Sequence, residues 1–175
     1  ELNSWSSIAK HTDNLIIFGG INPKNSQVSM GGSTEHDVAE QFKNFKRLQK
    51  NMVSISPQQD DSPEETNWLP IIPGTDMALM LAIAYVLETE NLADQTFLDT
   101  HSSGYHVFKK YFLGTDGHSA KTPEWASLET GIDASQIRDL ARNMASGRTL
   151  ICVSWSLQRA RYGEHPFWMA CVLAA

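Results

Sequence analysis

Residues 148–164, RTLICVSWSLQRARYGE, form the segment that most constrains the fold of this chain. The segment starts with a short apolar run at residues 149–153, which predicts a buried β-strand. A polar loop with aromatic and cationic side chains follows: Trp155, Gln158, Arg159 and Arg161. A helical pattern then begins near Glu164. Open α/β sheets bind ligands where the carboxyl end of a strand meets such a loop, so we expect the rest of the chain to build a sheet that presents it.

Three further segments have the patterns expected of strands in the same sheet. Residues 15–18 (LIIF) and 52–55 (MVSI) are short apolar runs, and residues 68–72 form an extended run between prolines. An amphipathic helix is predicted between the first two runs, because apolar residues recur there at helical spacing: Val38, Phe42, Phe45 and Leu48. Ser33 or Thr34 is the expected N-cap of that helix.

The remaining segments predict mainly helices. A helix that is apolar almost all round follows the turn at residues 73–76 and should be buried. Further helical patterns cover residues 92–99, 105–113, 124–130 and 134–145. Because strands and helices alternate, the sequence predicts an α/β fold. We expect a three-layer, Rossmann-like domain with a parallel sheet of about four strands, formed by residues 1–175 as a single domain.

Charge and motif content argue against several classes of function. The net charge of −6 comes without a basic stripe, which argues against a nucleic-acid partner. The longest apolar run, residues 77–87, is too short for a membrane span. The six histidines lack ligand spacing, and neither a G-x-S-x-G elbow nor a Walker motif is present, so no metal site, hydrolase triad or P-loop is predicted. Cys152 and Cys171 are expected to be small buried apolar residues.

Polar residues follow two of the predicted strands. Asn25 and Ser26 lie in the loop after the first strand, where they can donate or accept hydrogen bonds in front of a helix that favours phosphate. This loop lacks G-x-G-x-x-G spacing, so an ordinary strand–helix connection explains it as well. The second strand ends at Ile55-Ser56. In nucleotide-binding α/β folds that position faces a ribose and usually carries an acid, whereas Ser56 is a weaker partner or simply a capped strand end.

Two other segments contain candidate ligand contacts. Pro73-Gly74-Thr75-Asp76 enters a helix, and its simplest interpretation is an N-cap at Thr75 or Asp76. The Asp76 carboxylate could also accept hydrogen bonds from N1–H and the N2 amine of a guanine. In the loop after the last strand, Trp155 is costly to expose, and Arg159 can bind a phosphate or stack on a base.

Four stretches, in this order, resemble the dimethyl sulfoxide reductase family, in particular its trimethylamine N-oxide and biotin sulfoxide reductase-like branch. They are INPKNS after the first strand, ISPQQDD after the second, PGTDMALMLAIAYVL, and SWSLQRARYGEHPFWMACVLAA. The similarity runs along nearly the whole chain and includes FLDTHSSGYHVFKKYFLGTDG. The P-G-T-D-x-A-L-M-L and S-W-S-L-Q-R-A stretches are the most specific.

The resemblance implies a ligand shared by all these segments. Members of the family hold molybdenum, sometimes tungsten, between two pterin dithiolenes as bis(molybdopterin guanine dinucleotide), and they reduce N-oxides or S-oxides by oxygen-atom transfer. The chain would then be one of two related α/β domains that clasp the cofactor. The implied contacts are Asn25 and Ser26 on one dinucleotide, Ile55 and Ser56 at its ribose, Gly74, Thr75 and Asp76 at its guanine, and Trp155, Ser156 and Arg159 near the second cleft.

Two residues depart from the family pattern. Ser56 stands where the family usually has Asp, and Ser156 stands where it often has Gly, which implies a weaker or rearranged ribose contact. The family's protein ligand to the metal, usually a Ser, lies upstream of the matching segment. The resemblance therefore implies cofactor-binding residues without a complete active site, a small oxide as substrate, and the other domains of a parent enzyme as partners. Relatives occur in both periplasm and cytoplasm, so no single compartment is implied.

The lack of an initiator Met and the apolar final segment lead us to expect a piece of a longer protein. Two alternatives remain open on the sequence. One is a stand-alone α/β protein that binds a nucleotide at the same strand ends without molybdenum. The other is an interaction domain without nucleotide binding, which would expose apolar residues such as Phe167, Trp168 and Met169.

Overall fold

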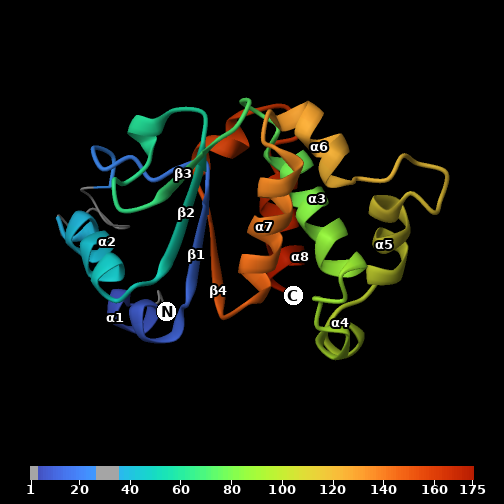
Figure 1. The fold of residues 1–175 in the computed structure, drawn as a ribbon, viewed down its shortest axis with the longest axis horizontal. Coiled ribbons are helices and arrows are strands. Elements are labelled where there is room, and N and C mark those ends of the chain that lie inside the picture. Colours follow the sequence, from blue (N-terminus) through green and yellow to red (C-terminus); the bar gives the residue numbers. More distant parts are fainter. Residues whose placement is uncertain (1–3, 27–35) are drawn as a thin grey trace.

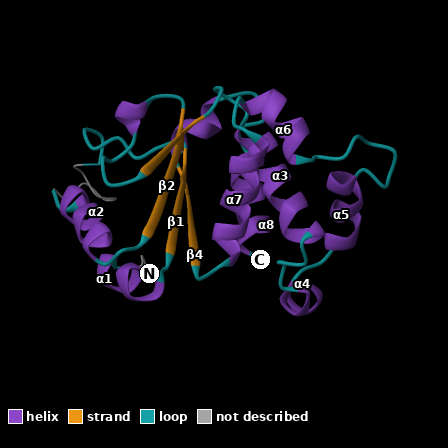
Figure 2. Ribbon diagram, in the orientation of Figure 1, coloured by secondary structure: helices purple, strands orange, loops and turns teal. Residues whose placement is uncertain are grey.

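A four-stranded parallel sheet lies at the centre of the molecule, in a computed structural model that describes residues 4–26 and 36–175 (Figures 1 and 2). Its strands are β1 (Asn14–Phe18), β2 (Asn51–Ser56), β3 (Asn67–Pro70) and β4 (Thr149–Val153). Their order in the sheet is β3-β2-β1-β4, and all neighbouring pairs are parallel. Leu15 of β1 is in register with Met52 of β2 and Leu150 of β4. The predicted parallel sheet is confirmed.

Helices cover both faces of the sheet, which gives the predicted three layers (Figure 1). Packed on one face are α1 (Trp5–His11) and α2 (Val38–Arg47). The other face carries α7 (Ala134–Ala145) and α8 (His165–Ala174), with α3 (Asp76–Thr89) packed against both. Beyond them lie α4 (Gln95–His101), α5 (Tyr105–Leu113) and α6 (Pro123–Thr130). None of the helices in the described residues combines the length and apolar character needed to cross a bilayer.

The apolar run at residues 15–18 is continuous because β1 is buried on both faces. Leu15 and Ile17 point toward α2, where they join the cluster that contains Phe42. Ile16 and Phe18 point to the opposite face and join the core formed with α3 and α7. The alternation of side chains along a strand thus divides one short apolar segment between two hydrophobic cores.

The beginnings and ends of the helices mostly follow the expected local signals. The first residue of α6, Pro123, follows the N-cap Thr122, whose hydroxyl accepts a hydrogen bond from the backbone N–H of Trp125. The helix α3 is buried almost all round, as predicted. The apolar stripe of α2 ends earlier than expected, because Leu48 follows the helix and is 49% exposed. Asp37 precedes α2, and the proposed caps Ser33 and Thr34 lie outside the described residues.

The two cysteines differ in exposure, and the expectation that both are buried is wrong for Cys171. We predict that a thiol reagent modifies Cys171 in the folded chain much faster than Cys152. Burial raises the pKa of the Cys152 thiol to about 11, so only roughly one thiol in a thousand is ionised at pH 8. Titration with a chromogenic disulfide would measure both rates. In Cys171→Ser, modification of the half-buried Cys152 that remains should be slow, and rapid modification of that variant would contradict the prediction.

Candidate functional site

The strand order reverses between β1 and β4, and at such a switch point the carboxyl ends of neighbouring strands diverge to leave a crevice. Backbone hydrogen bonds join the carboxyl ends of β4 and β1 and the carboxyl ends of β1 and β2. Ser154 donates its N–H to the Phe18 carbonyl at 2.8 Å, and Gly19 donates to the Ile55 carbonyl at 2.8 Å. A 3₁₀ helix, η2 (Trp155–Arg159), begins directly after β4 and lies over the end of β1. The carboxyl edge of the sheet is therefore where loops and helix starts converge.

A hollow of about 350 Å³ occupies the switch point, and we call it the β1–β4 crevice. It is lined by Ile17, Gly19, Gly20, Ile21, Asn22, Asn25, Ser26, Asp61, Cys152, Val153, Ser154 and Ser156. Three of the predicted site residues, Asn25, Ser26 and Ser156, therefore face the same space. The turn that carries Asn25 is fixed by Asn22, whose carbonyl accepts from the Asn25 N–H at 2.9 Å. The amide of Asn22 in turn donates to Asp61 Oδ1 at 2.8 Å.

A second hollow, of about 520 Å³, lies above the start of α3, and we call it the α3 cavity. Its lining is Gly19, Pro57, Asp61, Pro73, Gly74, Asp76, Met77, Ser156, Leu157, Ala160, Arg161, Tyr162, Gly163, His165 and Pro166. Gly19, Asp61 and Ser156 belong to both linings, so the two hollows adjoin along the carboxyl edge of the sheet. Together they offer space for an elongated ligand.

Asp76 is the most unusual side chain in the α3 cavity. It is the first residue of α3 and only 3% exposed, yet its Oδ1 atom has no hydrogen-bond partner among the described residues. Burial raises the pKa of this carboxyl above its usual value. A buried acceptor without a donor is costly, and such groups are generally satisfied by something else. The carboxylate is thus placed to accept hydrogen bonds from a ligand in the cavity.

The lining of the α3 cavity also contains a cationic and aromatic cluster. The guanidinium of Arg161 lies 4.8 Å from the ring centroid of Tyr162 and donates to its hydroxyl at 2.9 Å. The Tyr162 ring stacks on His165 with an interplanar angle of 4°. Tyr162 adopts a left-handed backbone conformation with φ of 61°, which is unfavourable for a bulky residue. The loop after η2 therefore holds Arg161 over an aromatic platform beside the cavity.

The other predicted site residues lie outside these two linings. Ile55 and Ser56 are fully buried beneath the edge, and the Ser56 hydroxyl donates to the Gln58 carbonyl at 2.7 Å. Thr75 is the N-cap position of α3, and its hydroxyl donates to the Ile72 carbonyl at 2.7 Å. Trp155 is 67% exposed, and Arg159 is exposed on the same 3₁₀ helix. Their roles stay predictions.

Several residues that face the hollows were not identified from the sequence. Asp61 contributes to both linings and lies at the end of the 3₁₀ helix η1 (Gln59–Asp61). The sequence shows it only as one acid in a polar loop, because its position depends on a contact with Asn22 across 39 residues. Gly19 directly follows the apolar run at residues 15–18, and nothing in the local sequence indicates that it lines a hollow. The sequence places Arg161 in the last loop, but no local signal indicates that it lines the cavity.

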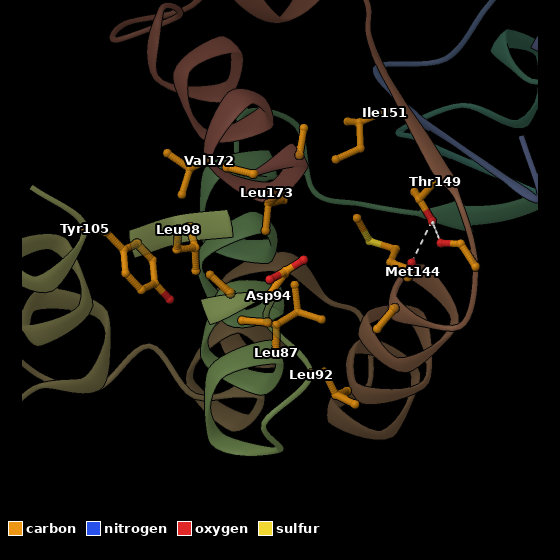
Figure 3. Close-up of a pocket in the computed structure, with 16 residues that line it drawn as sticks. Leu87, Leu92, Asp94, Leu98, Tyr105, Met144, Thr149, Ile151, Val172 and Leu173 are labelled. Atoms are coloured by element: carbon orange, nitrogen blue, oxygen red, sulfur yellow. Dashed lines mark hydrogen bonds between the residues drawn. The ribbon is translucent and has the colours of Figure 1, made fainter. Parts of the chain in front are cut away.

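A third hollow, of about 290 Å³, lies at the opposite edge of the sheet, near the start of β4 (Figure 3). Its lining is mostly apolar and comes from α3, α4, α7 and α8, with Leu87, Leu98 and Val172 among its residues. The carboxylate of Asp94 already accepts from the Phe97 N–H at 2.9 Å. No predicted site residue lines this hollow. Within residues 4–26 and 36–175, no three His, Cys, Asp or Glu side chains gather as a metal site.

The fold is an α/β architecture with two adjoining hollows at the carboxyl edge of a parallel sheet, which is where such folds bind ligands. The family model described as "Molybdopterin oxidoreductase" matches residues 2–175. The chain belongs to this family.

Curated relatives agree with this assignment. The chain is 39% identical to the trimethylamine-N-oxide reductase of Vibrio parahaemolyticus over 98% of its length, and 37% identical to the biotin sulfoxide reductase of Cereibacter sphaeroides over all of it. It spans only 22% and 24% of these two relatives. The acetylene hydratase of Pelobacter acetylenicus has the same fold, with a TM-score of 0.72 at 22% identity, over 95% of this chain and 21% of that one.

Proposed function

We propose that residues 1–175 form one α/β domain of a longer enzyme that reduces an N-oxide or S-oxide. In this proposal the domain binds one half of a bis(molybdopterin guanine dinucleotide) cofactor that carries molybdenum. The family assignment supports a molybdopterin, and the names of two relatives, a trimethylamine-N-oxide reductase and a biotin sulfoxide reductase, support the substrate class. Because the chain spans less than a quarter of those relatives, the remaining domains would complete the enzyme.

The observation that carries the proposal is the buried carboxylate of Asp76 in the α3 cavity, whose Oδ1 atom has no hydrogen-bond partner among the described residues. Guanine presents two neighbouring donors, N1–H and the N2 amine, which match the two oxygens of a carboxylate. Adenine has no proton on N1, so it would leave the carboxylate without its donors. Sites built around a buried polar group discriminate strongly against ligands that cannot pair with it. Asp76 therefore favours guanine over adenine.

The other predicted residues would contact different parts of the ligand along the carboxyl edge of the sheet. Gly74 and Thr75 would lie beside the guanine, and Asn25, Ser26 and Ser156 would contact the rest of the dinucleotide from the adjoining crevice. Ile55 and Ser56 would support the ribose region from below, and Trp155 and Arg159 would meet the cofactor from η2. When bound, the cofactor supplies two-electron chemistry with oxygen-atom transfer. This chain binds and orients the cofactor, while the metal ligand comes from elsewhere in the parent enzyme.

The proposal predicts what the purified parent protein contains. Acid release of the cofactor, followed by chromatography and metal analysis, should give two guanine nucleotides for each molybdenum, and the loaded enzyme should reduce trimethylamine N-oxide or biotin sulfoxide with a viologen donor. Guanine nucleotide without molybdenum would instead favour a stand-alone nucleotide-binding protein. If the purified protein contains no nucleotide and binds no added nucleotide, the proposal is contradicted and an interaction domain is favoured.

A further inference from the structure

The end of β2 lacks the acid that usually recognises a ribose in dinucleotide-binding sheets. In such sheets an Asp or Glu near the end of the second strand accepts hydrogen bonds from the ribose hydroxyls. Here that strand ends at Ser56, which is 0% exposed. The Ser56 hydroxyl donates to the Gln58 carbonyl at 2.7 Å and lies 3.2 Å from the Ser62 hydroxyl. It is thus committed to the chain itself and faces neither hollow.

A different carboxylate reaches the same edge of the sheet. Asp61 lies five residues after Ser56 and is a lining residue of both the β1–β4 crevice and the α3 cavity. Among the described residues, Asp61 is the only acidic residue that belongs to both linings. A ligand that extends from the Asp76 side of the edge to the Asn25 side would therefore pass Asp61.

The position of Asp61 is fixed by its neighbours. Its carbonyl oxygen lies so close to Gly20 that a Cβ atom there would come within 2.5 Å of it. Its Oδ1 atom accepts from the Asn22 amide at 2.8 Å. An ionised carboxylate has about four acceptor sites, so this one bond leaves capacity for further donors. The group is held in place beside the hollows and can still accept from a ligand.

We propose that Asp61 is the ribose-recognising residue of this chain and accepts hydrogen bonds from the ribose hydroxyls of the bound guanine nucleotide. This inference rests on the proposed guanine dinucleotide site and adds the residue that binds the ribose of the nucleotide. The carboxylate would reach the ribose from the last residue of η1, while the strand end itself is occupied by a buried serine.

The test compares two probes on the full-length protein purified free of cofactor: GDP and 2′,3′-dideoxy-GDP. Calorimetry should show that the parent sequence binds GDP roughly tenfold or more tightly than the dideoxy probe, because hydrogen bonds to a charged group are strong. Asp61→Asn keeps an amide oxygen for Asn22 but removes the charge. In this variant the preference should fall to within about threefold, through weaker GDP binding and unchanged binding of the dideoxy probe.

A matched control separates this role from structural effects. Asp60→Asn makes the same change at an exposed neighbour outside both linings. This variant should keep the full preference for GDP. The inference is overturned if Asp61→Asn keeps that preference or if it weakens both probes equally. If the parent sequence binds neither probe, the proposed guanine site itself fails.

Discussion

Asp76→Ala should produce a protein that retains far less molybdenum and yet is more stable in the absence of cofactor. The carboxylate is buried without a partner for Oδ1 among the described residues, so the cofactor-free protein bears its desolvation cost. Removing it should raise the free energy of unfolding by about 1–2 kcal/mol near pH 7. Loss of the proposed guanine contact should lower cofactor affinity roughly tenfold or more, with little change in substrate preference.

The stability gain should depend on pH in a defined direction. Burial places the pKa of Asp76 above its usual value in the folded chain, so the charged form is disfavoured on folding. The cost is absent when the carboxyl is protonated in both states. It develops as pH rises through the unfolded pKa of about 4, and it is complete above the folded pKa. Urea unfolding of the cofactor-free protein should therefore show a gain for Asp76→Ala at pH 7 and almost none at pH 3.

A matched control comes from another aspartate at the start of a helix. Asp94 caps α4 by accepting from the Phe97 N–H at 2.9 Å, and it lies at the opposite edge of the sheet. Asp94→Ala should lower stability by about 1 kcal/mol and leave molybdenum content unchanged. Normal molybdenum content in Asp76→Ala would count heavily against the guanine assignment. A loss of stability in that variant would show that the carboxylate already has a partner.

The sequence predicts the sheet well because its signals are local. The strand β1 is buried on both faces, and its residues 15–18 are all apolar, which makes them conspicuous in the sequence. The helices α5 and α7 have the bounds expected from their periodicity and their flanking residues. Each of these features depends on residues that are near one another in the chain.

The details of the site could not be predicted, because they depend on contacts between distant segments. The apposition of Asp61 and Gly20 joins the loops after two different strands, and no periodic pattern encodes it. Asp76 could be recognised as a helix-start residue, but its lack of a partner follows only from the packing around it. Residue type was also misleading for Trp155, which is 67% exposed although an exposed tryptophan is costly. The sequence thus predicted the carboxyl edge where the two hollows lie and left many of the residues that line them undetermined.

Gly20→Ala should be among the most damaging single changes at this edge. Gly20 has φ of +73°, and a Cβ atom there would lie 2.5 Å from the backbone oxygen of Asp61. Left-handed strain costs about 1–2 kcal/mol for a residue with a side chain. The clash with a backbone atom adds to this cost, so we expect a total loss of roughly 2–4 kcal/mol. Because the clash displaces Asp61 from the wall shared by both hollows, binding of GDP should weaken as well.

Gly104→Ala separates the effect of backbone strain from the effect of close packing. Gly104 has nearly the same φ, +81°, but a Cβ atom there would have nothing within 4 Å. This variant should therefore lose only about 1–2 kcal/mol and should bind GDP normally. The difference in unfolding free energy between the two variants measures the energetic cost of the steric clash with Asp61. Equal losses in both would mean that Gly20 is needed only for its backbone conformation, and the tight junction between the two loops would then not hold the site in shape.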